Sequence, residues 1–141
     1  MKRFLTLILT LVLAFGLVSC GNSNSTDSSD NADTANKTIA IIQFGSHASL
    51  HNCYDGIVKR LEDNGFNSEH CDIELLNSNF DASVSQTQAN TLVNKKADVI
   101  IAIATPSAVA AANAAADKDI PVVFCAITDP SVMQNYTNIT G

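Results

Sequence analysis

The sequence predicts an α/β protein built as a three-layer, Rossmann-like parallel sheet with four strands in the order β-α-β-α-β-α-β. Short apolar runs rich in β-branched residues alternate with longer segments whose apolar residues have helical spacing. Each apolar run ends in small or polar residues, as the strands of such sheets do at their ligand-binding edge. The alternation predicts parallel strands joined by right-handed crossovers.

Four apolar runs are the predicted strands. They lack the apolar–polar alternation of a half-exposed strand, which is typical of strands that helices cover on both faces. The predicted strands span residues 39–44, 71–76, 98–103 and 120–126.

Three segments between these runs are the predicted helices. Residues 49–64 carry apolar side chains at helical spacing, and Gly65 follows as a helix end. Residues 106–116 are rich in alanine and open with a proline, a favourable first residue of a helix. Residues 81–96 form the remaining helix, which we expect to bury Val84, Ala89, Leu92 and Val93. Residues 127–141 are expected to be mostly loop.

The N-terminus predicts an export signal over residues 1–19. Lys2 and Arg3 precede an apolar run of 14 residues, which is shorter than the approximately 20 residues needed to span a bilayer. The run ends Leu17-Val18-Ser19-Cys20-Gly21. This resembles the bacterial lipobox and implies that Cys20 is lipidated and becomes the mature N-terminus. An ordinary signal peptide that happens to contain a cysteine is the simpler alternative.

Residues 20–36 are predicted to be a disordered tether behind the lipid-bearing cysteine. They are almost entirely Asn, Ser, Thr, Asp, Gly and Ala, and they show no hydrophobic periodicity. Such a segment buries too little apolar area to fold. A low-complexity tail without a role is the alternative. Residues 37–141 remain as one small folded domain.

Charge and composition argue against binding to nucleic acid. The 141-residue chain has 14 acidic and 8 basic residues and a formal net charge of −6. Two of the basic residues belong to the export signal, so no basic patch is left for a phosphate backbone. Tryptophan is absent and aromatic residues are 6% of the chain, which disfavours a stacking platform for bases.

The strand ends point to an amino-acid ligand. Thr105-Pro106-Ser107 stands between a strand end and a helix start, where free N–H groups, the helix dipole and hydroxyl groups attract a carboxylate. Thr128 and Asp129 follow the last strand and supply further donors and an acid for an ammonium group. Together they suit a zwitterion. In the simpler explanation Thr105 caps the helix and Asp129-Pro130 is an ordinary turn.

Several other chemistries find little support in the sequence. It contains neither a GxGxxG nor a GxxxxGK[ST] phosphate loop, and we predict no cofactor. His47 and His51 have the spacing of two metal ligands on a helix, but no third ligand is apparent, so we predict no metal. Cys125 with His47 as a base would make a nucleophile, although cysteines here are by default small buried apolar residues.

Four segments carry a family resemblance. They are 39–44, ADVIIAIATPSAVAAANA at 97–114, DIPVVFCAITDP at 119–130, and Asn-Ile-Thr-Gly at 138–141. In that order and spacing they resemble the bacterial ABC-transporter substrate-binding proteins whose better-known members bind tryptophan, phenylalanine or tyrosine. The resemblance covers residues 38–141.

The resemblance implies two type I periplasmic-binding-protein-like lobes that close on a ligand. It assigns ligand contacts to three loops of this lobe: Gly45, Ser46, His47, Thr105, Pro106, Ser107, Thr128 and Asp129. The first loop departs from the family, since Ala48-Ser49 replaces the common Pro-Ala. Family members continue for about as long again, so we expect residues 37–141 to be an N-terminal lobe without its second lobe.

From these observations we expect a lipid-anchored, solute-binding component of an ABC importer on the extracytoplasmic face of the cell membrane. Its partners would be an amino acid, for which an aromatic one is the candidate, an ABC permease and, through Cys20, the membrane. An enzyme domain of the same topology and a truncated lobe without a ligand are the alternatives. The sequence offers no base–nucleophile pair at useful spacing for the enzyme.

Overall fold

A computed structural model describes residues 36–133, 136 and 139–141 of the chain. The predicted export signal, Cys20 and nearly all of the predicted tether lie outside the described residues. The elements are β1 (Lys37–Gln43), α2 (Ala48–Asp63), β2 (Cys71–Asn77), α3 (Ala82–Asn94), β3 (Val99–Ile103), α4 (Thr105–Ala115), β4 (Val122–Cys125), the 3-10 helix η1 (Pro130–Met133) and β5 (Ile139–Thr140).

All strands pair in parallel, in the order β2-β1-β3-β4-β5. The chain therefore runs from β1 outward to β2, returns through α3 to β3 on the other side of β1, and continues to β4 and β5. The strand order reverses between β1 and β3. In open α/β sheets, the crevice at the carboxyl ends of the two strands flanking such a reversal is where ligands bind.

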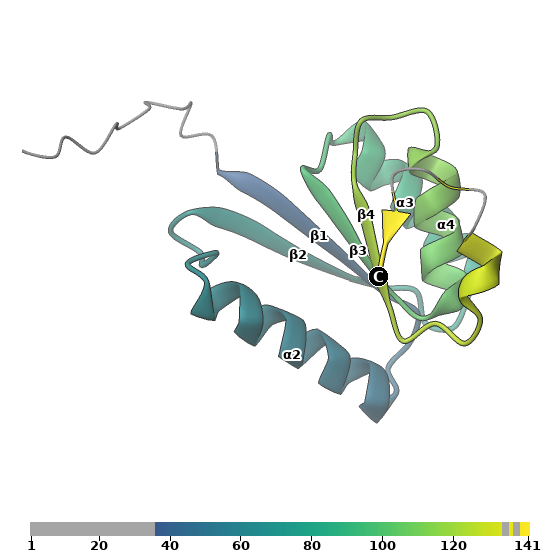
Figure 1. The fold of residues 1–141 in the computed structure, drawn as a ribbon, viewed down its shortest axis with the longest axis horizontal. Helices are drawn as coiled ribbons and strands as arrows, with labels where there is room; N and C mark the ends of the chain where they lie inside the picture. Colours follow the sequence, from purple (N-terminus) through teal and green to yellow (C-terminus); the bar gives the residue numbers. More distant parts are fainter. Residues whose placement is uncertain (1–35, 134–135, 137–138) are drawn as a thin grey trace, which may run out of the picture. The chain divides into compact units, whose positions relative to one another are not determined.

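Helices cover both faces of the sheet, as predicted. Figure 1 shows α2 on one face and the α3–α4 pair on the other. Alternate residues of β1 divide between the two layers: Ile39 and Ile41 face α2, while Ala40 and Ile42 face α3 and α4. All four are buried, which explains why this strand shows no apolar–polar alternation in the sequence.

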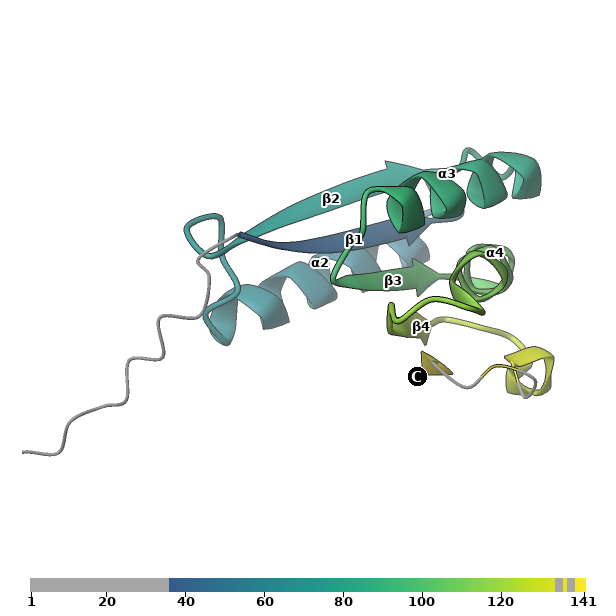
Figure 2. The same cartoon turned by 90° about the horizontal axis from the view of Figure 1, so that it is seen from above.

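The two covering layers differ in density. Six residues of α4, all alanine or serine, are buried, so this helix lies close to the sheet and to α3. No residue of α2 is fully buried, and its apolar side chains, such as Ile57 and Leu61, are only half-buried against the sheet. Figure 2, the view from above, shows α3 and α4 side by side.

The structure corrects the sequence-based prediction in two places. Residues 127–141 are not mostly loop, because η1 buries Met133 and β5 adds a fifth strand beside β4. In α3, Val84 is exposed, and Ser85 takes the buried position that the phase of Ala89 and Leu92 requires. The other elements begin or end within a few residues of their predicted limits.

Among the described residues, no helix is long and apolar enough to cross a membrane.

Candidate ligand site at the carboxyl edge

Backbone hydrogen bonds join the loops that follow β1 to β4 into one continuous edge. The N–H of Phe80 donates to the carbonyl of Phe44 (2.7 Å), and the N–H of Phe44 donates to the carbonyl of Ile103 (3.3 Å). The N–H of Ala104 donates to the carbonyl of Cys125 (3.1 Å). The predicted site residues from three separate segments therefore belong to the same edge of the sheet.

The start of α4 lies beside the point where the strand order reverses. Helix α4 begins at Thr105, with Pro106 second, and its cap residue Ala104 supplies no side-chain hydrogen bond. Ala104 has φ 80° and ψ 154°, a conformation that is normally confined to glycine. The first-turn N–H groups of Thr105 and Ser107 have no partner within the helix, so the dipole end is left for an anion.

Thr105 does not cap its helix, contrary to the simpler explanation of the sequence. Its Oγ1 instead accepts a hydrogen bond from the backbone N–H of Thr128 (3.1 Å). This bond fixes the loop after β4 against the start of α4. The structure thereby brings together Thr105 and Thr128, two predicted site residues from different loops.

Ser107 and Asp129 are less open than the sequence suggests. Ser107 is fully buried, and its Oγ has no hydrogen-bond partner among the described residues, so its hydroxyl does not face the cleft. The Asp129 carboxylate is exposed and accepts a hydrogen bond from the N–H of Ser131 (2.9 Å). Hydrogen bonds from Ser131 hold the pKa of Asp129 below its usual range, so this group is anionic at neutral pH. The turn expected as the simpler explanation is present as well.

The loop after β1 borders a separate hollow of about 440 Å³ at the same edge, lined by Gln43, Ser46, His47, Ala48, His51, Leu75 and Asn77. Ser46 Oγ accepts a hydrogen bond from Asn77 Nδ2 (2.9 Å). Gln43 is buried and donates to the carbonyl of Gly45 (2.7 Å), while its buried Oε1 lacks a hydrogen-bond partner among the described residues. One acceptor beneath the hollow is therefore unused.

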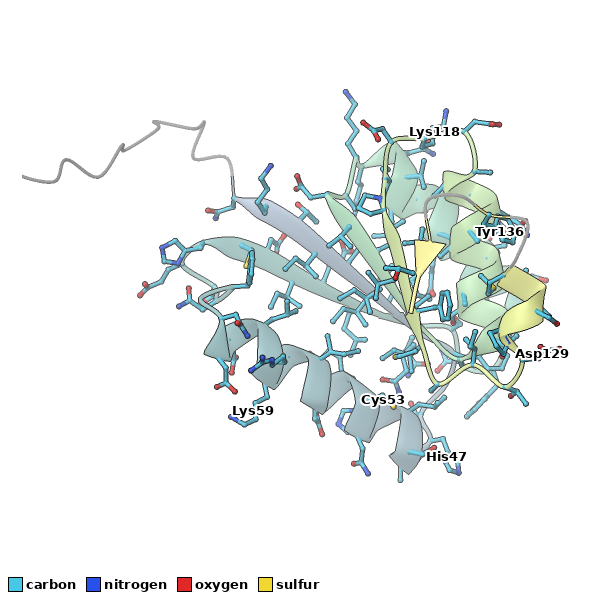
Figure 3. All side chains as sticks on the ribbon, viewed as in Figure 1. His47, Cys53, Lys59, Lys118, Asp129 and Tyr136 are labelled. Carbon is cyan, nitrogen blue, oxygen red and sulfur yellow. The ribbon has the colours of Figure 1, made fainter. Side chains whose placement is uncertain are left out.

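His47 is the N-terminal cap of α2. Its Nδ1 accepts a hydrogen bond from the N–H of Ser49 (3.3 Å) and lies 2.8 Å from Ser49 Oγ. Figure 3 shows His47 at the start of α2 and Asp129 beyond the end of β4. A base role toward Cys125 finds no support, because Nδ1 is engaged and burial raises the pKa of the Cys125 thiol. Within the described ranges, no three His, Cys, Asp or Glu side chains group as a metal site.

Phe80 is a candidate site residue that the sequence analysis missed. Its side chain is 57% exposed, its φ is 64°, and its ring meets the ring of Phe44 edge-on with centroids 5.8 Å apart. The ring also lies over Gly45, where a Cβ atom would overlap it. A phenylalanine directly after Asn77-Ser78-Asn79, outside the helical pattern of the next segment, was the available signal.

The family model for ABC transporter substrate-binding proteins matches residues 38–141. The chain belongs to this family. A "Tyrosine-binding protein" of Clostridioides difficile (strain R20291) is 38% identical over 135 residues, which are 92% of this chain and 39% of that relative. The chain thus spans about two fifths of this relative's length.

Solved structures agree with the assignment. A ligand-free, open substrate-binding protein with adhesive properties from Clostridium difficile has a TM-score of 0.69 and 39% identity over 74% of this chain and 38% of its own. A Streptococcus pneumonia ABC domain in complex with L-Trp has a TM-score of 0.69 and 36% identity over 76% of this chain and 38% of its own. A leucine-binding protein from Thermotoga maritima, 23% identical with a TM-score of 0.64, shares the fold. The fold is therefore that of a type I periplasmic-binding-protein lobe, as predicted.

Proposed function

We propose that this chain forms one wall of the binding cleft of an ABC-importer substrate-binding protein, which captures an aromatic amino acid and delivers it to a permease. The observation that carries the proposal is the uncapped start of α4 at the reversal of strand order, fixed by the Thr105–Thr128 hydrogen bond. Family membership implies an extracytoplasmic location. The relatives' printed ligands, tyrosine and tryptophan, support an aromatic amino acid.

The ligand's carboxylate would bind at the start of α4. The N–H of Thr105, which is only half-buried, belongs to the first turn, where the helix dipole favours negative charge. Pro106 has no N–H and holds the first turn in a helical conformation. The strained backbone of Ala104 is typical of a position that function maintains.

The ammonium group and the aromatic side chain need different partners. Asp129, anionic at neutral pH, is the acid in the loop that Thr128 fixes beside α4. Phe80 follows β2, two strand spacings or about 10 Å from β3, which is comparable to the length of an aromatic amino acid. Its exposed ring would pack edge-on or offset against the ligand's ring, as aromatic pairs prefer. Gly45, Ser46 and His47 would complete this end of the cleft.

Binding is best tested on a chimera. It joins this full chain to the part of the Clostridioides difficile relative that follows the segment similar to this chain. Tight binding in two-lobed proteins needs contacts from both sides of a closed cleft. We expect this chimera to bind aromatic amino acids with a Kd of about 1 μM by titration calorimetry. The chain alone would bind at about 1 mM, because half of the contacts and hence roughly half of the free energy are missing.

Two variants of the chimera test the assignment of the wall. Thr105→Val, which removes the bond that holds Thr128 beside α4, and Asp129→Asn, which removes the charge for the ammonium group, should each weaken binding about tenfold. Thr91→Val, on the exposed side of α3, is the matched control and should bind like the parent. Unchanged binding in both site variants, or no heat from any of the twenty amino acids, would contradict the proposed function.

The membrane attachment is a separate part of the proposal. A lipidated N-terminal cysteine carries at least two acyl chains, which is enough for stable anchoring. Cys20→Ala should move the protein from the membrane fraction to the medium or leave it as an unprocessed precursor. Normal processing and membrane retention of this variant would disprove lipidation at Cys20.

A further inference from the structure

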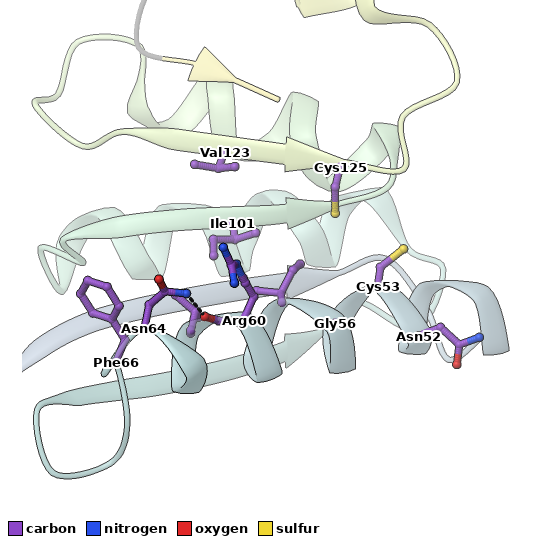
Figure 4. Close-up of a pocket in the computed structure, with 11 residues that line it drawn as sticks. Asn52, Cys53, Gly56, Arg60, Asn64, Phe66, Ile101, Val123 and Cys125 are labelled. Carbon is purple, nitrogen blue, oxygen red and sulfur yellow. Dashed lines mark hydrogen bonds between the residues drawn. The ribbon is translucent and has the colours of Figure 1, made fainter.

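Two thiols from different elements line one hollow on the α2 side of the sheet. Cys53 lies in the second turn of α2, and Cys125 is the last residue of β4. Both pack against the buried cluster that contains Ile101 and Ile103. Figure 4 shows both side chains at the same end of a hollow between α2 and the strands.

The surroundings of the two thiols are apolar. The hollow measures about 560 Å³ and is lined by apolar residues such as Ile57, Leu61 and Val123. The polar residues of its lining are Asn52, Arg60 and Asn64. Burial there raises the pKa of Cys125, and the nearby Cys53 thiol raises it further. Both cysteines are half-buried free thiols in the structure.

The third described cysteine is in a different environment. Cys71 is buried at the start of β2, at the opposite end of the strands, and its Sγ donates to the carbonyl of Asn67 (3.4 Å). The parallel register places Cys71 level with Lys37, whereas Cys125 is level with Ile103. Cys71 is therefore distant from Cys125 along the strand direction. Of the described cysteines, Cys53 is the one placed to pair with Cys125.

We propose that Cys53 and Cys125 are a reversible dithiol–disulfide pair that links the first part of α2 to the end of β4. The extracytoplasmic location that the family implies is the kind of compartment in which disulfides form and persist. A loop containing β2, α3, β3 and α4 would be closed by this bond. It would also tie the helix that His47 caps to the strand end that precedes Thr128.

The oxidant is a small-molecule or protein disulfide, and the step is thiol–disulfide exchange. The Cys53 thiolate attacks one sulfur of the oxidant, which releases one thiolate and leaves a mixed disulfide on Cys53. The Cys125 thiolate then attacks the Cys53 sulfur and releases the second thiolate. The two protons lost by the cysteines are taken up by the two released thiolates, so the oxidant is reduced by two electrons. The raised pKa of Cys125 makes the second step slow at neutral pH.

Tryptic peptide mapping decides the pairing, because each described cysteine falls on a different peptide. Cleavage after Lys37, Lys59, Arg60, Lys95 and Lys118 gives 38–59 with Cys53, 61–95 with Cys71 and 119–141 with Cys125. The full chain is incubated with oxidised glutathione at pH 8, quenched with acid, alkylated with N-ethylmaleimide and digested without reduction. We expect a 38–59/119–141 species two hydrogens lighter than the two free peptides, with 61–95 alkylated.

Thermal unfolding supplies a second readout. The oxidised chain should melt about 10 °C above the same chain after dithiothreitol, because the bond restricts the unfolded state. Cys53→Ser and Cys125→Ser should abolish this difference, whereas the control Cys71→Ser should keep both the difference and the linked peptides. Alkylation of both 38–59 and 119–141 after the glutathione treatment, or a link from either one to 61–95, would overturn the proposal.

Discussion

The two ends of the strands differ in how well their groups are satisfied. At the amino edge, Asp98 accepts hydrogen bonds from Lys37 Nζ (2.9 Å) and from the N–H of Thr38 (2.8 Å). At the carboxyl edge, the polar atoms that lack a partner in the described part of the protein are Gln43 Oε1, Ser85 Oγ and Ser107 Oγ. They lie at the end of β1 and in the first turns of α3 and α4.

The backbone shows the same difference. Among the described non-glycine residues with positive φ, Asn79, Phe80, Ala104 and Ala126 follow strand ends at the carboxyl edge, and Lys96 lies at the amino edge. Strained backbone and unsatisfied polar groups persist where function maintains them. The carboxyl edge is therefore organised for a ligand, and the amino edge for stability. Substitutions that relieve a strained or unsatisfied residue at the carboxyl edge should therefore stabilise the protein clearly. Substitutions at the amino edge should stabilise it little or destabilise it.

The largest gain is expected from Ala104→Gly. Glycine adopts the φ of 80° and ψ of 154° without steric cost, and the relief of strain exceeds the added entropy of the unfolded chain. We expect the free energy of unfolding in urea to rise by about 1–2 kcal/mol. Ala116→Gly is the matched control, because Ala116 has helical φ and ψ and is exposed. It should lower the free energy of unfolding by about 0.5–1 kcal/mol. Destabilisation at both positions would show that Ala104 is not strained.

Ser107→Ala should stabilise by about 1 kcal/mol, because it removes a buried hydroxyl without a partner. Ser83→Ala, also in the first turn of a helix but exposed, shares the gain in helix propensity and serves as the control. The comparison is made from the midpoints of urea unfolding at equal slope. Equal effects at both positions would mean that the Ser107 hydroxyl is satisfied in solution.

Asp98→Asn should destabilise by less than about 1 kcal/mol at pH 6, since the Lys37–Asp98 pair is largely exposed. Hydrogen bonds from Thr38 and Lys37 hold the pKa of Asp98 below its unfolded value. Its contribution is therefore complete above about pH 5 and is lost as the pH falls below about 4. The difference between wild type and Asp98→Asn in urea unfolding should shrink between pH 6 and pH 3. A difference that stays constant over this range would rule out the ionised Asp98 as its source.

The smallest effect is expected at Lys96, the one described non-glycine residue with positive φ at the amino edge. Its φ of 59° follows the end of α3, where glycine is the preferred residue. Lys96→Gly should raise the free energy of unfolding by about 0.5 kcal/mol, less than Ala104→Gly. A gain as large as that of Ala104→Gly would remove the distinction between the two edges.

The sequence predicts the parts of this fold that depend on local pattern. Apolar runs of β-branched residues locate β1 and β3, and Gly65, with φ 86°, ends α2 as expected. The strand β5 could not be found in this way, because two residues are too few to form a recognisable pattern. It is defined only by its pairing with β4 in the described structure. The predicted burial of Val84 was wrong, because Val84 is apolar but lies outside the helical phase of the buried residues Ala89 and Leu92.

The candidate site was predictable as a set of loops but not as a set of contacts. Small and polar residues follow every predicted strand, and the structure places the loops that they form at one edge of the sheet. Three details depend on tertiary structure: the Thr105–Thr128 hydrogen bond, the burial of Ser107, and the ring of Phe80 over Gly45. No local pattern encodes a contact between loops that follow different strands.

The central position of β1 has a consequence for how the chain folds. β1 is the first strand made, yet it pairs on one side with β3, and Lys37 and Asp98 are 61 positions apart. Synthesis must therefore proceed through residue 103 before the hydrogen-bond ladder of β1 can be completed. Sheets dominated by such distant pairings fold slowly. The export signal predicted for residues 1–19 would benefit from this delay, because the domain would stay unfolded while that signal is being recognised.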